Sequence, residues 1–196
     1  MPKIVDHEKQ RKRIAEATWR VITREGMEKA TVRNIAREAG VSVGSLRHYF
    51  SSQSELLAFS MKLVSERVNK RIKEMDFSCP PLEGMKRLIR QFLPLEKETK
   101  KEMEVWFAFT QRALWDPALQ PLSNQVYHEL RSVIKLIIET LIKLELALPN
   151  LNVDLEVDRL YALIDGLAMH GIMQSNHLTP EMVESIVDHH LRSLCR

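Results

Sequence analysis

Apolar positions recur at helical spacing along most of the chain. Within residues 6–25 the positions expected to face inward follow one another at steps of three and four residues: Ile14, Ala17, Thr18, Val21 and Ile22. Gly26 then provides a stop for this helix. Two short helices follow over 32–39 and 43–49, each preceded by a hydroxyl residue suited to an N-cap, Thr31 or Ser42, with Gly40 between them. A fourth helix, to about residue 75, begins after Ser52, which forms a capping-box pattern with Glu55.

Proline marks the change from this region to the rest of the chain. The segment Cys79-Pro80-Pro81 cannot continue a helix, so we place a joint there. Helical patterns return over 81–93, 97–115, 118–148, 154–176 and 180–195, and no long run has the two-residue period of a strand. The sequence therefore predicts an all-α protein with three parts: an N-terminal three-helix domain over 1–52, a connecting helix over 53–78 and a helical C-terminal domain over 79–196.

Composition agrees with this prediction and excludes several classes of protein. Glycine is scarce, at 6 of 196 residues, which disfavours a sheet protein with many tight turns. The two cysteines, Cys79 and Cys195, provide neither a disulfide scaffold nor a zinc site, and no cofactor or metal is expected. Charged residues from Lys3 to Arg13 replace the apolar core of an export signal, and no apolar run approaches a membrane span of about 18 residues. We therefore expect a cytoplasmic protein that does not enter the membrane.

Charge is distributed unevenly along the chain. Residues 1–75 carry 16 Lys and Arg against 9 Asp and Glu, a net of +7, whereas residues 76–196 carry 13 against 17, a net of −4; together they give the overall +3. A basic N-terminal third is typical of a chain that meets a polyanion at one end.

Residues 32–49 have the residue types that a helix-turn-helix requires. A small residue, Ala36, permits a close helix crossing, and Gly40 suits the tight turn. The second helix carries an outward face that can enter the major groove, where arginine reads guanine: Val43, Gly44, Arg47 and His48. We take Arg47 as the leading base reader. Thr31 and Ser42 at helix N-termini, along with Tyr49, are expected to hold phosphates, and Arg33 is a further expected DNA contact. The alternative is a plain helical hairpin within a bundle.

At these positions the sequence resembles the TetR family of bacterial transcriptional regulators. The resemblance lies in residues 30–36 (ATVRNIA), 39–50 (AGVSVGSLRHYF) and 54–57 (SELL). It implies a DNA-binding domain, a connecting helix and a C-terminal domain that dimerises and often holds a small ligand. Two positions depart from the pattern: Gln53 stands where many members have a lysine, and Arg47 stands where many have a tyrosine. One expected phosphate contact is therefore neutral, and the operator sequence does not follow from relatives.

The C-terminal part resembles the choline-responsive BetI-type branch of that family. The similar segments are residues 106–109 (WFAF), 116–119 (DPAL) and 163–167 (LIDGL). Quaternary ammonium ligands favour aromatic cages. Thr110 and Ala168, however, stand where the BetI pattern tends to have tryptophan. A choline-type ligand is therefore not expected to carry over to this chain.

Two helices of the C-terminal part contain candidate contacts for a small effector. Four residues lie on one side of the helix over 97–115: Met103, Trp106, Phe107 and Thr110. Asp165 and Met169 lie on the mostly apolar helix over 154–176. Methionine and aromatic side chains adapt to apolar ligands, although ordinary core packing explains each of these residues as well.

The last two helices are the predicted dimer contacts. Their apolar stripes include Leu163, Leu167, Val183, Ile186, Val187, His190 and Leu194. Two helices from each subunit would form a four-helix interface and present two recognition helices to a pseudo-palindromic operator. The alternative is burial of both stripes inside one chain.

No catalytic motif is present, so we do not expect an enzyme. The sequence predicts a homodimeric repressor that an effector of unknown identity releases from double-stranded DNA. The alternative is a DNA-binding protein of the same fold that senses nothing and acts through a protein partner.

Overall fold

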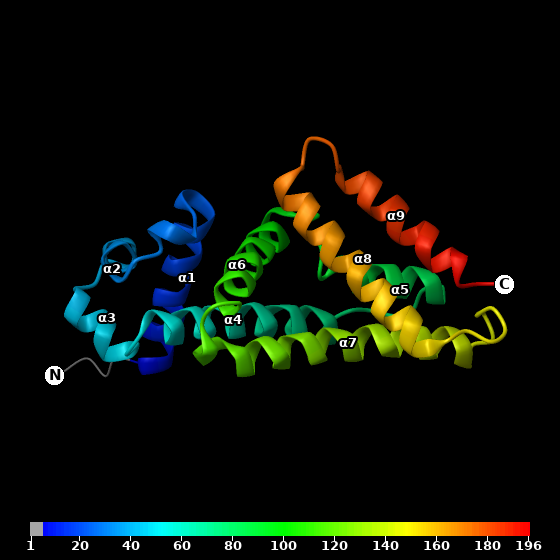
Figure 1. Cartoon of the computed structure of the whole chain (residues 1–196), viewed down its shortest axis with the longest axis horizontal. Coiled ribbons are helices and arrows are strands. Elements are labelled where there is room, and N and C mark those ends of the chain that lie inside the picture. Colours follow the sequence, from blue (N-terminus) through cyan, green and yellow to red (C-terminus); the bar gives the residue numbers. More distant parts are fainter. Residues whose placement is uncertain (1–5) are drawn as a thin grey trace. The chain divides into compact units, whose positions relative to one another are not determined.

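The structure, a computed structural model that describes residues 6–196, is helical along this range (Figure 1). Its elements are α1 (His7–Glu25), η1 (Met27–Lys29), α2 (Val32–Ala39), α3 (Val43–Tyr49), α4 (Gln53–Lys73), α5 (Pro81–Arg90), α6 (Lys97–Ala113), η2 (Pro117–Leu119), α7 (Gln120–Lys143), α8 (Val153–Met173) and α9 (Pro180–Ser193). No strand occurs in residues 6–196, where Ala147 and Cys195 form an isolated β-bridge. The predicted all-α class is confirmed.

Capping residues fix several of the helix ends where the sequence places them. The Asp6 carboxylate accepts a hydrogen bond from the Lys9 amide at the start of α1. Gly26 and Gly40 end α1 and α2 with φ values of 85° and 66°, which glycine adopts at little cost. The predicted helix 118–148 is shorter at both ends. Residues 117–119 form a separate 3₁₀ turn capped by Asp116, and beyond Lys143 the chain reverses through a left-handed residue.

The chain forms two compact units. The first contains α1, α2, α3, α4 as far as Arg67, and residues 104–123. The division falls within α4, upstream of the joint expected at Cys79. Helix α1 packs against α2 and α3, and Trp19 of α1 donates a hydrogen bond to the Ser60 carbonyl of α4 (3.3 Å). Large side chains that are fully buried form the core of this unit: Ile14, Ile35, Leu46, Phe50, Leu56, Phe109 and Leu119.

The second unit contains residues 68–103 and 124–196. Helix α9 packs against α5 and α8 (Figure 1). Two ion pairs join α5 to α9, Lys86 to Asp188 (3.1 Å) and Arg90 to Glu184 (3.0 Å). Its core includes Ile89, Leu93, Ile134, Ile138, Leu141, Leu160 and Ile164.

Neither a membrane-spanning helix nor a metal-binding cluster is found in the part of the chain that the structure describes. None of its helices is long and apolar enough to span a membrane. No group of three His, Cys, Asp or Glu side chains between residues 6 and 196 could hold a metal ion.

Candidate functional site

Helices α2 and α3 form a helix-turn-helix around Gly40. Thr31 and Ser42 cap the two helices, since their hydroxyl oxygens accept from the amides of Asn34 (3.3 Å) and Ser45 (3.0 Å). Each hydroxyl keeps its own hydrogen, which remains free to be donated to an anion. Buried residues from both helices hold the pair together: Ile35, Ala36, Ala39 and Leu46.

The outward face of α3 consists of residues that the sequence assigned to DNA. Gly44, Arg47 and His48 are exposed, as is Val43, while Tyr49 is partly buried at the end of the helix. Small residues at the beginning of this face permit close approach to base edges, and a guanidinium follows them one turn later. The structure therefore presents a short helix with the shape and donors that major-groove recognition requires.

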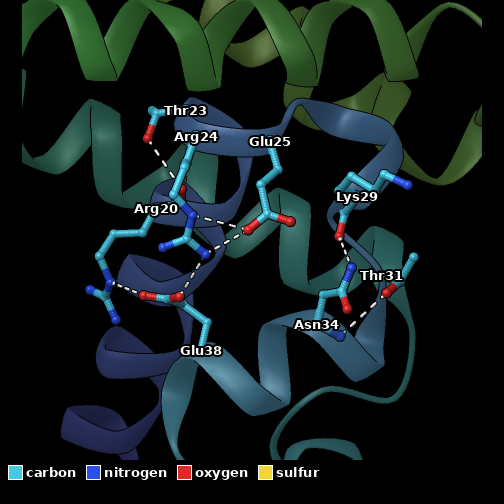
Figure 2. A network of polar contacts seen from close by, with 8 residues as sticks. All are labelled: Arg20, Thr23, Arg24, Glu25, Lys29, Thr31, Asn34 and Glu38. Carbon is cyan, nitrogen blue, oxygen red and sulfur yellow. Dashed lines mark hydrogen bonds and ion pairs between the residues drawn. The ribbon is translucent and has the colours of Figure 1, made fainter.

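A network of charged side chains holds α2 against α1 (Figure 2). Arg20 donates to one oxygen of Glu38 (2.7 Å), and Arg24 donates to the other (2.9 Å) and to Glu25 (2.6 Å). The bonds from Arg20, and then Arg24, lower the pKa of the Glu38 carboxyl. This network engages Nε of Arg20 and two guanidinium nitrogens of Arg24 within the protein.

Arginines of the first unit fall into two groups. Five form ion pairs with acidic side chains: Arg11, Arg20, Arg24, Arg67 and Arg112. Four form no ion pair within residues 6–196: Arg13, Arg33, Arg37 and Arg47. In the second group, Arg33 and Arg37 lie on α2 and Arg47 lies on α3. Arg13 of α1 lies beside the turn, since one of its guanidinium nitrogens is 3.5 Å from the position that a Cβ at Gly40 would occupy. Unpaired cations thus surround the helix-turn-helix.

Two of these four arginines were not predicted as site residues. Sequence reasoning assigned Arg33 and Arg47, but Arg13 and Arg37 become candidates only when their lack of acidic partners is seen. Gln53, at the position where a lysine was expected, donates its side-chain amide to the Ala30 carbonyl (2.8 Å). The side-chain NH2 group of Gln53 is therefore already engaged in a hydrogen bond within the protein.

One polar contact links the end of α6 to the start of α4 within the first unit. The Ser54 hydroxyl donates to one oxygen of Asp116, and the other oxygen accepts from the Ala118 amide (3.1 Å). The Ser54 bond contributes most to lowering the pKa of the Asp116 carboxyl. This contact joins the α6–α7 turn to the residues that follow the recognition helix.

The six predicted effector contacts are distributed over the two units. Trp106, Phe107 and Thr110 are partly buried residues of α6 in the first unit. Met103 belongs to the second unit and is 6% exposed, and Met169 of α8 is partly buried. The most deeply buried positions of α6 lie on a neighbouring face and include Glu102, Val105, Phe109 and Ala113.

Asp165 on α8 is a partly buried carboxylate that accepts no hydrogen bond from the described residues. Burial raises its pKa to about 6. Tyr161 lies one helical turn earlier, with its ring 5.0 Å from that of Tyr127 on α7. Burial, and then the charge of Asp165, raises the pKa of Tyr161. A partly buried carboxylate without a partner in the described chain is a candidate ligand contact.

The predicted dimer residues divide into buried and accessible sets. Leu167, Val183, Val187 and Leu194 are at most 6% exposed inside the single chain. These four side chains are therefore already buried within the single chain. His190 is half-buried, its Nε2 atom has no hydrogen-bond partner in the described chain, and burial lowers its pKa to about 4.

Leu163 and Ile186 line an apolar groove between α8 and α9, together with Ala162, Gly166, Leu167, His170, Gln174, His177 and Leu178. Two glycines of α8, Gly166 and Gly171, differ in their surroundings. A Cβ at Gly171 would lie 2.7 Å from Pro94, so this glycine serves packing within the chain. A Cβ at Gly166 would meet no atom within 4 Å. The groove is therefore an apolar surface that no part of the described chain covers.

Comparisons with known proteins agree along the whole chain. Residues 14–58 match a family model described as bacterial regulatory proteins, tetR family, and residues 81–196 match one described as BetI-type transcriptional repressor, C-terminal. The HTH-type transcriptional regulator PksA of Bacillus subtilis is 45% identical over 100% of this chain and 94% of its own length. The regulator BetI of Vibrio vulnificus is 28% identical over 97% of this chain and 95% of its own. A transcriptional regulator from Rhodococcus sp. Rha1 has a similar solved structure, with a TM-score of 0.83, 28% identity, and coverage of 94% and 95%.

Proposed function

The chain belongs to the TetR family of bacterial transcriptional regulators, with a C-terminal domain of the BetI type, and from this premise we propose that it is a cytoplasmic homodimeric repressor released from its operator by a small effector. The observation that carries the proposal is the exposed face of α3 among arginines that have no acidic partner in residues 6–196. Such a surface supplies base readers and phosphate contacts together.

Within this surface Arg47 is the base reader, and the flanking groups hold the backbone. Arg47 stands one turn after Gly44, where a guanidinium can reach the edge of a guanine. Thr31 and Ser42 donate their hydroxyl hydrogens to phosphates at the starts of α2 and α3. Arg33 and Arg37 add positive charge along α2.

Replacing Arg47 by Ala is expected to cost about 1–3 kcal/mol of binding per half-site and to relax selectivity at one base pair. The measurement is fluorescence anisotropy titration on the operator, on operators altered at single positions, and on random DNA. An equal loss on all of them would assign Arg47 to a phosphate instead. Arg24→Ala is the matched control, since that guanidinium is already bound to Glu25 and Glu38, and it should leave base selectivity unchanged.

The groove between α8 and α9 is the proposed dimer contact. A two-fold axis through it would place the same apolar residues of two chains against each other, and the open surface at Gly166 permits close helix approach. Two recognition helices would then face half-sites separated by about one DNA turn or a multiple of it.

We place the contacts of the proposed effector at Asp165 and Met169 of α8, within the second unit. Release requires that the effector bind more tightly to a conformer with wrongly placed recognition helices.

Asp165→Asn should stabilise the effector-free protein and abolish the effector response. Because burial raises the pKa of this carboxyl to about 6, the folded state bears the cost of an unpaired charge above that pH. The gain should be about 1–2 kcal/mol at pH 8 after allowance for partial exposure, and it should vanish as the pH falls through 6 toward 4. Urea denaturation of both proteins at pH 8, 6 and 4.5 measures it. Lower stability of the Asn variant at pH 8 would show that the carboxylate is structural.

A further inference from the structure

Three rings from two distant parts of the sequence meet at the end of the recognition helix. His7 is the first residue of α1, and His48 and Tyr49 are the last two residues of α3. The ring centroid of His7 lies 4.8 Å from that of Tyr49 and 6.1 Å from that of His48, and the last two rings lie 5.4 Å apart. Two imidazoles and a phenol, all hydrogen-bond donors, are thus gathered on one surface of the first unit.

The donors of this cluster are not used within the described chain. None of the three side chains forms a hydrogen bond or an ion pair there. The neighbouring acidic side chains are engaged elsewhere, since Asp6 accepts from the Lys9 amide and Glu8 pairs with Lys12. His7 and His48 are exposed, so their ring nitrogens are accessible from outside.

The position of the cluster relates it to the DNA-reading face. Arg47 immediately precedes His48, so the cluster lies within a few ångströms along α3 of the proposed base reader. A recognition helix crosses the major groove between two phosphate backbones, and donors near its end meet the backbone rather than the bases. The first turn of α1 also presents amide groups without intrahelical partners and the positive end of its helix dipole.

We propose that His7 is a further DNA-contacting residue, which together with His48 and Tyr49 holds one backbone phosphate at the edge of each half-site. This inference rests on the proposed operator binding. It assigns a DNA contact to α1, a helix in which sequence reasoning found no site residue. The ring contact with Tyr49 sets the position of the His7 imidazole before DNA arrives.

The test uses the full-length protein and its operator with two substitutions at one position. His7→Phe keeps a ring against Tyr49 but removes the nitrogen donors, and His7→Ala removes both. Each should weaken binding on the order of tenfold, by the same factor on operator and on random DNA, because a phosphate carries no sequence information. Phosphate ethylation interference should lose one position per half-site in both variants. His128→Phe is the matched control, since His128 on α7 is also exposed and packs against a tyrosine, Tyr127, at 5.2 Å; it should bind as the unaltered protein does.

Full affinity and an unchanged interference pattern for His7→Phe would overturn the proposal. A loss confined to His7→Ala would also overturn it, because only the ring packing would then matter. Failure of the unaltered protein to select any inverted repeat would instead refute operator binding itself, so the two failures are distinguishable.

Discussion

Leu163→Glu should convert the protein to a monomer at micromolar concentration and reduce operator affinity about 100-fold or more. Leu163 lines the apolar groove between α8 and α9, where the only polar lining residues are His170, Gln174 and His177. On a two-fold interface the introduced carboxylate of each chain would be buried close to the same carboxylate of the partner chain. No Lys or Arg is among the groove residues to compensate these charges. Since a dimer reads two half-sites at once, loss of the dimer removes the second half of the binding energy.

Sedimentation velocity measures the oligomeric state, and anisotropy titration measures the affinity. The matched control is Leu155→Glu, which places the same charge on the same helix at a residue that is 61% exposed and outside the groove. Because Leu163 is itself partly exposed in the single chain, circular dichroism should show a folded helical protein in both variants. A Leu163→Glu protein that sediments as a dimer would place the interface elsewhere.

Arg71→Ala is expected to destabilise the second unit by about 3–5 kcal/mol. Arg71 of α4 donates to both carboxylate oxygens of Glu102 on α6 (2.9 and 2.7 Å) and to the side-chain oxygen of Gln91 (2.9 Å). The Glu102 side chain is only 2% exposed, whereas that of Arg71 is 32% exposed. Removal of the guanidinium leaves a buried carboxylate without its partner, which costs far more than the loss of a surface pair.

Urea denaturation of three variants separates this explanation from simple loss of packing. The joint replacement of Arg71 by Met and Glu102 by Leu should recover most of the lost stability, because no buried charge remains. Arg87→Ala, which removes a half-exposed partner of Glu83, should cost no more than about 1 kcal/mol. If Arg71→Ala costs as little as Arg87→Ala, then Glu102 is not held by this pair.

Local signals account for the parts of the fold that the sequence predicted correctly. The hydroxyl caps at Thr31 and Ser42 and the positive-φ residues Gly26 and Gly40 act within one helical turn. The helix ends that they set can therefore be predicted without knowledge of tertiary contacts. The end of α7 could not be predicted in this way. Its apolar pattern continues to residue 148, but the chain turns at Glu145, where the Leu146 amide bonds back to the Leu141 carbonyl.

The sequence pattern predicts the faces of a helix, but it does not show which face the rest of the chain covers. The outward face of α3 follows from helical periodicity and the type of each side chain. The α9 stripe contains Val183 and Ile186 at equivalent spacing, yet Val183 is 1% exposed and Ile186 lines the open groove. The packing of α5 and α8 determines which side of α9 is covered within the chain. The periodicity of the α9 sequence carries no information about those two helices. Likewise, the unpaired state of Arg13 and Arg37 depends on where the acidic side chains lie.

Selection of bound fragments from bacterial genomic DNA, performed at two salt concentrations, tests the central claim most directly. Counterion-driven affinity falls steeply with salt for any sequence, so comparison of the two selections isolates the contribution of base reading. A dimer with two α3 helices predicts an inverted repeat that is recovered at both concentrations, with half-sites about one helical turn or a multiple of it apart. Fragments without a shared motif, which disappear as salt is raised, would contradict an operator-binding repressor and leave a DNA-binding protein without sequence preference.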